Sequence, residues 1–344
     1  MATKKTRIIL RILLVIVLLV IITGGTALYL YKSKATTITS DYYLRIGNDD
    51  NIASLALKLE KECGLKYPSV FIKVAERMNL QRWMKKGRYQ LTPNMTITDV
   101  VRLFRSGRSQ TVNLVVRGMT DVQQFAENCG NKLEPDTDAF LYLLNDTAYL
   151  DSMGFNLKTV FALPLPDTYN VFWHTEPDEL MQRLKKEYDK YWNDNRKALA
   201  LQCGLTPIEV STLASIVCKE TNQVDEMPIV AGMYLNRLRM GMPLQADPTI
   251  KFALNQPLLK RVLKIHLTVE SPYNTYKYNG LPPGPICIPS KQAIEAVLHF
   301  TEHNYIFMCA REDFSGYHNF TVSYNEHLLN AKRYQAALDR RGIQ

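Results

Sequence analysis

An uncharged stretch of 20 residues, Ile12–Tyr31, lies near the start of this 344-residue chain and limits what the chain can fold into. A helix rises about 1.5 Å per residue and a bilayer core is about 30 Å thick, so about 20 apolar residues cross it. Four basic residues between Lys4 and Arg11 precede the stretch. Because basic residues stay on the cytoplasmic side, we predict a single-pass anchor with a cytoplasmic N-terminus and an exported remainder.

A cleavable signal peptide is the competing interpretation, but the apolar run is long and no A-x-A-like site follows it. We therefore favour a retained anchor in the cell (inner) membrane. Since no second apolar run approaches this length, roughly 310 residues should form an extracytoplasmic or periplasmic part. A part of that size suits two domains better than one.

Composition and periodicity divide the chain into four segments. We predict a cytoplasmic N-terminus and transmembrane anchor over residues 1–32, a Thr- and Ser-rich linker over 33–40, a small subdomain over 41–110 and a larger domain over 111–344. Helical and strand patterns are mixed in both folded segments, so the predicted fold class is α+β.

The small segment alternates strand and helix patterns in a recognisable order. The order is strand, helix, helix, strand, over Tyr42–Ile46, Asn51–Cys63, Ser69–Met78 and Arg88–Leu91, and a further helix runs to about Ser106. This order is typical of small carbohydrate-binding modules of the LysM type. A generic α+β spacer between membrane and catalytic part fits the pattern equally well.

The charge pattern argues against a nucleic-acid platform. The formal net charge is +9, but four positive charges belong to the flank of the predicted anchor and the rest are spread without a long basic run. The remaining excess is compatible with an anionic, wall-like or membrane-near partner.

Neither the cysteines nor the histidines indicate a metal or other cofactor. No C-x-x-C pair occurs, so zinc binding and thioredoxin-like chemistry are disfavoured. The even number of cysteines permits disulfides without requiring them. The spacing of His303, His318 and His327 matches no helical metal pair.

Glu220 is the residue that says most about function. Thr206, Pro207 and Glu209 predict the start of a helix with a capping box. From that start, apolar residues recur at helical spacing at Val210, Leu213, Ile216 and Val217.

Glu220 continues the same face, three residues after Val217 and four after Ile216. Burial and the negative end of the helix dipole should both raise its pKa, which suits a general acid near neutral pH. The alternative is a structural ion pair with Arg237 or Arg239. We interpret Cys218, two residues earlier, as an apolar helix residue and not as a nucleophile.

Two further regions carry candidate groups. A helix over Pro228–Met240 contains Asn236 and Arg237, and Asp247 is then predicted to be the N-cap of another helix that starts at Pro248. Aromatic and amide groups beside Gly- and Pro-rich loops over residues 271–286 suit a sugar groove, although a structural loop with buried tyrosines fits as well.

Taken in order, these motifs resemble the YceG-like family of endolytic murein transglycosylases over about residues 40–335. The matching motifs are ASIVCKET at 214–221, NRLRMGMPLQADPT at 236–249, SPYNTY at 271–276, NGLPPGPI at 279–286 and HNF at 318–320, and LPDTY at 165–169 agrees too. The family typically has Glu-Lys-Glu-Thr where this chain has Cys218-Lys-Glu-Thr221.

The resemblance implies a membrane-anchored lyase that cleaves the β-1,4 bond between N-acetylmuramic acid and N-acetylglucosamine in nascent peptidoglycan. Cleavage leaves a 1,6-anhydro-muramic acid end and terminates glycan elongation, alongside peptidoglycan synthases. The resemblance implies that Glu220 is the general acid/base and that no cofactor is needed. The predicted substrate-binding residues are Asn236, Arg237, Gln245, Asp247, Tyr273, Asn274, Thr275 and Tyr276.

Two other functions compete with this hypothesis. A muramidase would hydrolyse the same bond and would need Asp247 or another acid to activate water. A non-catalytic scaffold would bind glycan through the LysM-like unit, with Glu220 merely structural.

Overall fold

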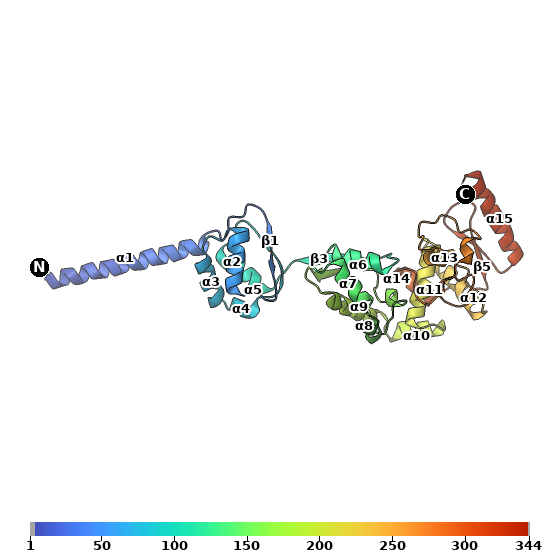
Figure 1. Cartoon of the computed structure of the whole chain (residues 1–344), viewed down its shortest axis with the longest axis horizontal. Helices are drawn as coiled ribbons and strands as arrows, with labels where there is room; N and C mark the ends of the chain where they lie inside the picture. The colour runs from blue at the N-terminus through green and yellow to red at the C-terminus, as the bar shows by residue number, and fades with distance from the viewer. Residues whose placement is uncertain (1–3, 343–344) are drawn as a thin grey trace. The chain divides into compact units, whose positions relative to one another are not determined.

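The computed structural model describes residues 4–342, except for the side chains of residues 4–10, 27, 28 and 31. Helices and short two-stranded sheets are mixed along the chain, which confirms the α+β class (Figure 1). Tertiary contacts group the chain into two compact units. Unit 1 comprises residues 1–112 and 172–174, and unit 2 comprises residues 113–171 and 175–344. The domain boundaries predicted from composition stay a prediction.

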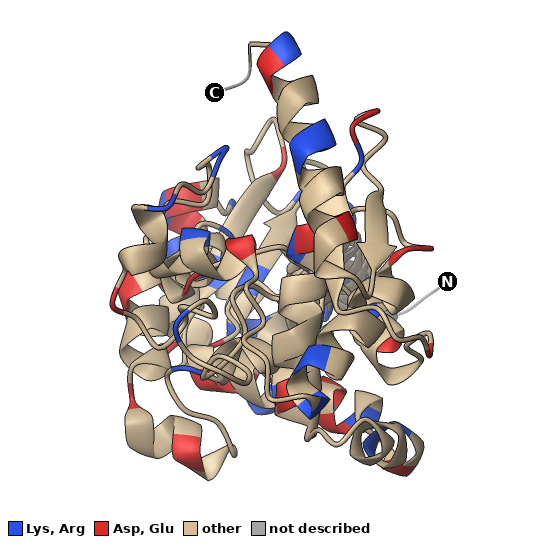
Figure 2. Ribbon diagram, turned by 90° about the vertical axis from the view of Figure 1, so that its right-hand side faces the viewer, with Lys and Arg blue, Asp and Glu red and all other residues tan. Residues whose placement is uncertain are grey.

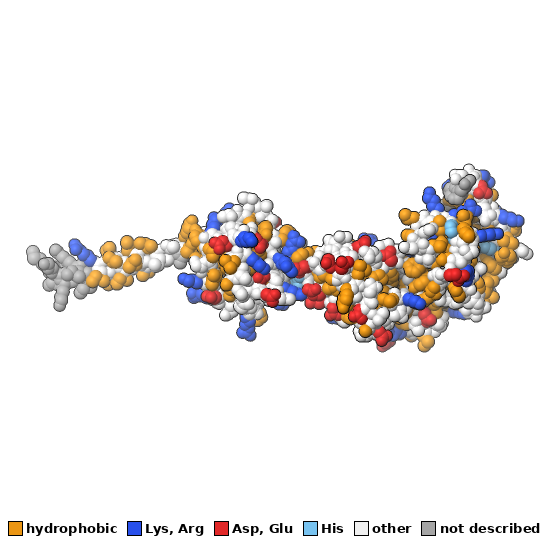
Figure 3. Space-filling view, in the orientation of Figure 1, with side chains coloured by type: hydrophobic (Ala, Val, Ile, Leu, Met, Phe, Trp, Pro, Cys, Tyr) orange, Lys and Arg blue, Asp and Glu red, His pale blue; other side chains and the backbone are white. Residues whose placement is uncertain are grey.

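The first helix, α1 (Lys4–Lys32), contains the predicted anchor. Its apolar side chains from Ile12 to Ile22 are exposed (Figure 3). Within the described residues no single helix combines the length and apolarity needed to cross a membrane, and only the bent pair α10 (Asp194–Gln202) and α11 (Pro207–Glu220) meets those criteria jointly. Part of the predicted span, at Ala27, Leu28 and Tyr31, lies outside the described side chains, as does its basic flank before Arg11.

Unit 1 continues with the predicted order of strands and helices. The elements are β1 (Tyr42–Ile46), α2 (Ile52–Cys63), α3 (Pro68–Arg77), a short α4 (Leu80–Trp83), β2 (Gly87–Leu91) and α5 (Ile97–Ser106). β1 pairs antiparallel with β2, with Leu44 opposite Tyr89. Tyr89 and Phe104 of α5 are fully buried and meet edge to face at 5.3 Å between ring centroids, which places the core between the sheet and the helices.

Unit 2 is larger and mainly helical, with two short two-stranded sheets. Its elements are β3 (Thr111–Val116), α6 (Val122–Gly130), α7 (Thr137–Leu144), α8 (Thr147–Ser152), η1 (Val160–Ala162), β4 (Asp167–Phe172), α9 (Pro177–Tyr191), α10 (Asp194–Gln202), α11 (Pro207–Glu220), α12 (Met227–Arg239), α13 (Asp247–Ala253), η2 (His266–Thr268), α14 (Lys291–Leu298), β5 (Phe307–Ala310), β6 (His318–Thr321) and α15 (Tyr324–Arg340). β3 pairs with β4, and β5 pairs antiparallel with β6.

Helix α11 is the centre of unit 2, because α10, α12, α13, α14 and η1 all pack against it (Figure 1). Every residue from Val210 to Val217 is buried, so the helix is enclosed on all sides and not on one face alone. Its polar members satisfy their hydroxyls within the helix: Ser211 donates to the Pro207 carbonyl at 3.0 Å and Ser215 to the Thr212 carbonyl at 2.6 Å.

Charged residues of both signs are interspersed along the described ribbon (Figure 2). This distribution agrees with the prediction that the positive excess is not concentrated in a basic platform.

Two leucines of α2 offer a matched test of the unit 1 core. Leu59 is fully buried and Leu57 is 67% exposed. We expect Leu59→Ala to lower the free energy of unfolding by about 2–5 kcal/mol, because it removes buried apolar surface and leaves a cavity. Leu57→Ala should change it by less than about 0.5 kcal/mol. Urea titration of the two variants measures both, and equal effects would contradict the described core.

Candidate active site

A cavity of about 520 Å³ opens beside the end of α11, and we call it the Glu220 cavity. Its walls come from segments far apart in the sequence: the last residue of α11, α12, the turn before α13, Tyr276, the β5–β6 hairpin and α15. Five residues singled out from the sequence line it together, namely Glu220, Arg237, Gln245, Asp247 and Tyr276.

Helix α11 begins as predicted and carries Glu220 to the cavity. Thr206 is the N-cap and forms the expected capping box: the Glu209 carboxylate accepts from the Thr206 backbone N–H at 2.7 Å. Because α11 is held rigidly by its neighbours, the position of its last residue is well defined.

The Glu220 carboxyl is bound by a tyrosine and not by an arginine. Tyr234 Oη of α12 donates to Glu220 Oε1 at 2.6 Å. No ion pair of Glu220 occurs among the described residues, and the guanidinium of Arg237 is engaged elsewhere. The structural ion pair considered from the sequence is therefore absent from the part of the chain described.

Burial raises the pKa of Glu220 to about 7. The negative charge of Asp247 raises this pKa further, whereas the Tyr234 hydrogen bond and the Lys251 ammonium lower it. Glu220 as a whole is partly exposed to solvent, and it lines the cavity. A carboxyl with this pKa is present in both protonation states near neutral pH, as an acid/base catalyst requires.

Asp247 is the second carboxylate of the cavity. The prediction that it caps α13 is wrong by one position, since Ala246 is the N-cap and Asp247 is the first helical residue. Its carboxylate accepts instead from Tyr276 Oη at 2.6 Å. Each of the two acids thus receives a hydrogen bond from one tyrosine.

Arg237 braces one wall of the cavity. It is 5% exposed and donates to the carbonyls of Pro243 and Ile306, both at 2.9 Å, and to Gln245 Oε1 at 2.6 Å. Gln245 has φ +52°, a left-handed conformation that costs a residue with a side chain on the order of 1 kcal/mol. The Arg237 contact holds this conformation, while its predicted contact with substrate stays a prediction.

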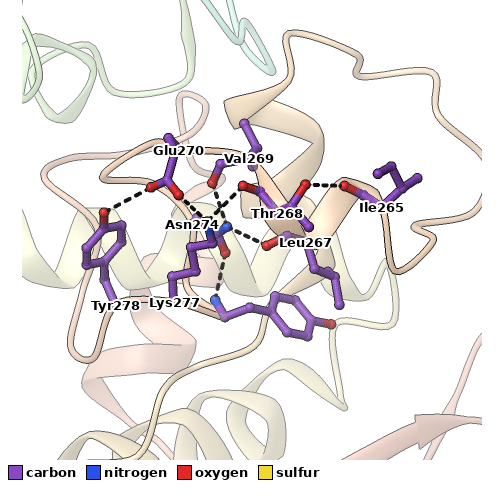
Figure 4. Close-up of polar contacts among 9 residues, drawn as sticks. Ile265, Leu267, Thr268, Val269, Glu270, Asn274, Lys277 and Tyr278 are labelled. Carbon is purple, nitrogen blue, oxygen red and sulfur yellow. Dashed lines mark hydrogen bonds and ion pairs between the residues drawn. The ribbon is translucent and has the colours of Figure 1, made fainter.

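The loop that presents Tyr276 is organised by Asn274, which is fully buried (Figure 4). Its Nδ2 donates to the carbonyls of Leu267 at 2.9 Å and Val269 at 2.8 Å, and its Oδ1 accepts from the Tyr276 backbone N–H at 3.0 Å. Lys277 closes the same loop by donating to Glu270 and to the Thr268 carbonyl (Figure 4). All donors and acceptors of the Asn274 amide shown here serve the loop itself.

Thr275 connects this loop to the turn that carries Gln245 and Asp247. Its Oγ1 accepts from the Ala246 backbone N–H at 3.0 Å and lies 2.8 Å from Thr249 Oγ1. Its carbonyl accepts from the Gln245 backbone N–H at 3.0 Å. Thr275 therefore sets the separation of Tyr276 and Asp247.

Four predicted sugar-binding residues do not line the Glu220 cavity: Asn236, Tyr273, Asn274 and Thr275. The Asn236 amide donates to the carbonyls of His303 at 2.7 Å and Tyr305 at 3.1 Å. The Tyr273 ring packs on Phe252, 4.7 Å between centroids. Their placement makes them supports of the walls, and their predicted substrate contacts stay untested.

The sequence interpretation missed Tyr234 and His318, which both line the cavity. His318 begins β6, and its Nδ1 lies 2.9 Å from Oε2 of Glu226, a carboxylate that is 3% exposed. Oε1 of Glu226 accepts from the His318 backbone N–H at 2.6 Å. Tyr234 lies two residues before the motif that starts at Asn236, and His318 is the first residue of the HNF motif. Their position in or beside these motifs was the only sequence signal that could have identified them.

Four of the six cysteines are buried, and Cys309 of β5 lines the Glu220 cavity. All six are free thiols, and Cys218 lies with its Sγ 3.6 Å from that of buried Cys287, outside the lining of the Glu220 cavity. Among the described residues no group of three His, Cys, Asp or Glu side chains is arranged to hold a metal ion.

Comparison with known families and structures agrees with this arrangement. The model of the YceG-like family matches residues 44–333. The chain belongs to the YceG-like family. A protein named endolytic murein transglycosylase from Streptococcus pneumoniae serotype 2 (strain D39 / NCTC 7466) is 27% identical over 304 residues, covering 79% of this chain and 55% of its own length.

A second relative of the same name, from Bacillus subtilis (strain 168), is 25% identical over 339 residues and 91% of each chain. This chain therefore spans about half of the streptococcal protein and most of the Bacillus one. The crystal structure of a YceG-like protein from Listeria monocytogenes aligns with a TM-score of 0.52 and 23% identity, over 84% of this chain and 99% of that one, which shows a shared fold.

The raised pKa of Glu220 has a consequence for stability. The folded state holds this proton more tightly than the unfolded state, so wild-type stability falls as pH rises from the ordinary acid range to about 7, and then levels off. Glu220→Gln removes the buried charge. We expect the variant to be more stable than wild type at pH 8, by on the order of 3 kcal/mol, and equally stable near pH 4.

Urea unfolding at the two pH values measures this difference. Exposed Glu302 provides the control, since Glu302→Gln should leave the difference near zero at both. A Glu220→Gln variant that is less stable than wild type at pH 8 would contradict the raised pKa.

Proposed function

We propose that this chain is a lytic transglycosylase of peptidoglycan that cuts within nascent glycan strands. The observation that carries the proposal is the Glu220 carboxyl, hydrogen-bonded by Tyr234 and with its pKa raised to about 7 by burial in a cavity. The printed names of its relatives in Streptococcus pneumoniae and Bacillus subtilis support the same reaction class.

One acid is sufficient for this reaction. Glu220 protonates the glycosidic oxygen between N-acetylmuramic acid and N-acetylglucosamine, so that the leaving group departs as an alcohol. The resulting carboxylate takes the proton from the 6-hydroxyl of the same muramyl residue, whose oxygen attacks C1 and closes a 1,6-anhydro ring. No water is consumed, and the intramolecular nucleophile already has a high effective concentration.

Tyr234 affects Glu220 both when it donates a proton and when it takes one up. Its hydroxyl donates to the carboxyl and favours the ionised form, against the effect of burial. The hydrogen bond thereby stabilises the carboxylate formed after proton donation, while burial keeps that carboxylate basic enough to take up a proton. The braced walls around Gln245 and Tyr276 hold the sugar and exclude water from C1.

The anchor and the small subdomain complete the proposal. The uncharged stretch Ile12–Tyr31 and its basic flank support a single-pass anchor with the Glu220 cavity outside the cell (inner) membrane. Tethering would confine cleavage to newly made glycan beside the peptidoglycan synthases and so terminate elongation. The strand and helix order of unit 1 supports a LysM-like glycan contact.

Product analysis tests the reaction directly. We expect the full-length chain to convert uncrosslinked peptidoglycan to fragments that end in 1,6-anhydro-muramic acid, one water lighter than hydrolytic fragments by mass spectrometry. Glu220→Gln should lower the rate by at least about 100-fold, because a general acid contributes about 10²–10⁴-fold. Glu302→Gln should cleave normally. Full activity of Glu220→Gln would exclude Glu220 as the acid, whereas no cleavage by a folded wild type would favour a scaffold.

A muramidase is the second candidate, because Asp247 lines the same cavity as Glu220. In a hydrolase the two acids divide the roles of acid and base, and the products have reducing ends. Asp247→Asn distinguishes the two. A lyase retains anhydro products at a reduced rate, whereas a hydrolase that uses Asp247 as its base is inactivated.

The pH dependence should follow Glu220. Because the protonated acid starts the reaction, we expect kcat/KM to fall as pH rises above about 7. Tyr234→Phe removes a hydrogen bond that favours the ionised form, so the pKa of Glu220 should rise and the descending limb should move to higher pH. Rate profiles between pH 5 and 9 measure this shift, and a shift to lower pH would contradict it.

A further inference from the structure

A second cavity, of about 380 Å³, is lined by residues next in sequence to residues of the first, and we call it the Lys219 cavity. Lys219 and Pro248 line it, while their sequence neighbours Glu220 and Asp247 line the Glu220 cavity. The end of α11 and the start of α13 therefore line both cavities, and we call these residues the shared edge.

The Lys219 cavity differs chemically from its neighbour. Phe252, Ile286 and Pro248 give it apolar walls, and Lys219 and Lys251 add two ammonium groups. Within the described part of the chain neither lysine forms a hydrogen bond or an ion pair through its side chain. Both charges are available to a ligand.

The acid on the wall of this cavity, Asp121, is already used. It is the N-cap of α6, where its Oδ1 accepts from the Gln124 backbone N–H at 2.8 Å and its Oδ2 from Thr120 Oγ1 at 3.5 Å. The lysines thus keep a net positive charge in the cavity, even with Asp121 ionised.

A bare sugar is a poor match for this surface. Sugar hydroxyls are bound by amides and carboxylates, whereas two ammonium groups above apolar walls suit a ligand with carboxylates and small apolar side chains. The stem peptide of peptidoglycan has this chemistry: it begins at the lactyl group of the muramyl residue with alanine and glutamate and ends in a carboxylate. It is covalently attached beside the bond that Glu220 would cleave.

We propose that the Lys219 cavity binds the anionic stem peptide of the muramyl residue at the scissile bond, with Lys219 and Lys251 pairing with its carboxylates. This inference rests on the proposed function. Binding of the stem across the shared edge orients the sugar against Glu220, so the chain should prefer stem-bearing strands to bare glycan.

The test compares two substrates: uncrosslinked stem-bearing strands and the same strands stripped of stems by an amidase. For each protein, kcat/KM is measured on both substrates. The value for stem-bearing strands divided by the value for stripped strands gives the specificity for stems. We expect the ratio to fall about tenfold in the Lys219→Ala/Lys251→Ala variant, since each partly exposed charge pair contributes a few-fold. The ratio cancels any effect of losing Lys251 on Glu220 itself.

Lys197 of α10 provides the matched control, because it is exposed and does not line the cavity. Lys197→Ala should keep the wild-type ratio. Lys219→Glu should lower the ratio more than Lys219→Ala, because it repels the stem. A double variant with the wild-type ratio would overturn the inference, as would a wild type that cleaves stripped strands as well as stem-bearing ones.

A binding measurement separates failure of this inference from failure of the proposed function. The probe is a synthetic L-alanyl-γ-D-glutamyl tripeptide stem, titrated into wild type and the double variant by calorimetry at low and high salt. Salt-sensitive binding that the double variant loses supports the stem site even if no cleavage is found. Cleavage of glycan by a wild type that does not bind the tripeptide would overturn the stem site and leave the transglycosylase proposal intact.

Discussion

The hydrogen bond between Tyr234 and Glu220 joins the two helices on which the site depends. α11 supplies the acid from the middle of the core, and α12 supplies the hydroxyl that keeps the buried carboxyl from being fully protonated. Without burial the carboxyl would already be ionised at neutral pH and could not donate a proton, and without the Tyr234 hydroxyl its pKa would be higher and its protonated form a weaker acid. The pKa of about 7 results from burial and this opposing hydrogen bond, together with the smaller effects of Asp247 and Lys251.

The rest of the cavity is held by polar side chains whose hydrogen bonds go to the protein itself. Arg237 secures the strained Gln245, Asn274 folds the loop before Tyr276, and Thr275 ties that loop to the turn at Asp247. Each is buried, where an unpaired polar group would cost on the order of 1–3 kcal/mol. The geometry of the acids therefore depends on contacts that make no direct use of substrate.

Local signals were enough to predict α11, its capping box and the placement of Glu220, because caps and helical periodicity act within a few residues. These local signals could not distinguish residues that line the cavity from residues that only support its walls. An amide such as that of Asn274 binds a sugar hydroxyl or a backbone carbonyl equally well, and only packing decides which one it meets. Tyr234, His318 and Glu226 were missed for the same reason, since their contacts join residues 14 and 92 positions apart.

The enclosure of α11 explains how the protein tolerates its buried acid. A carboxylate without an ionic partner destabilises the fold where it is ionised, so the cost is largest above pH 7. Residues Val210–Val217 bury a full helix surface beside it, and the hydroxyls among them are satisfied inside the helix. The buried core around α11 thus raises the pKa of Glu220 and also offsets the free energy that its charge costs the fold. A more exposed α11 would provide neither the raised pKa nor the compensating burial.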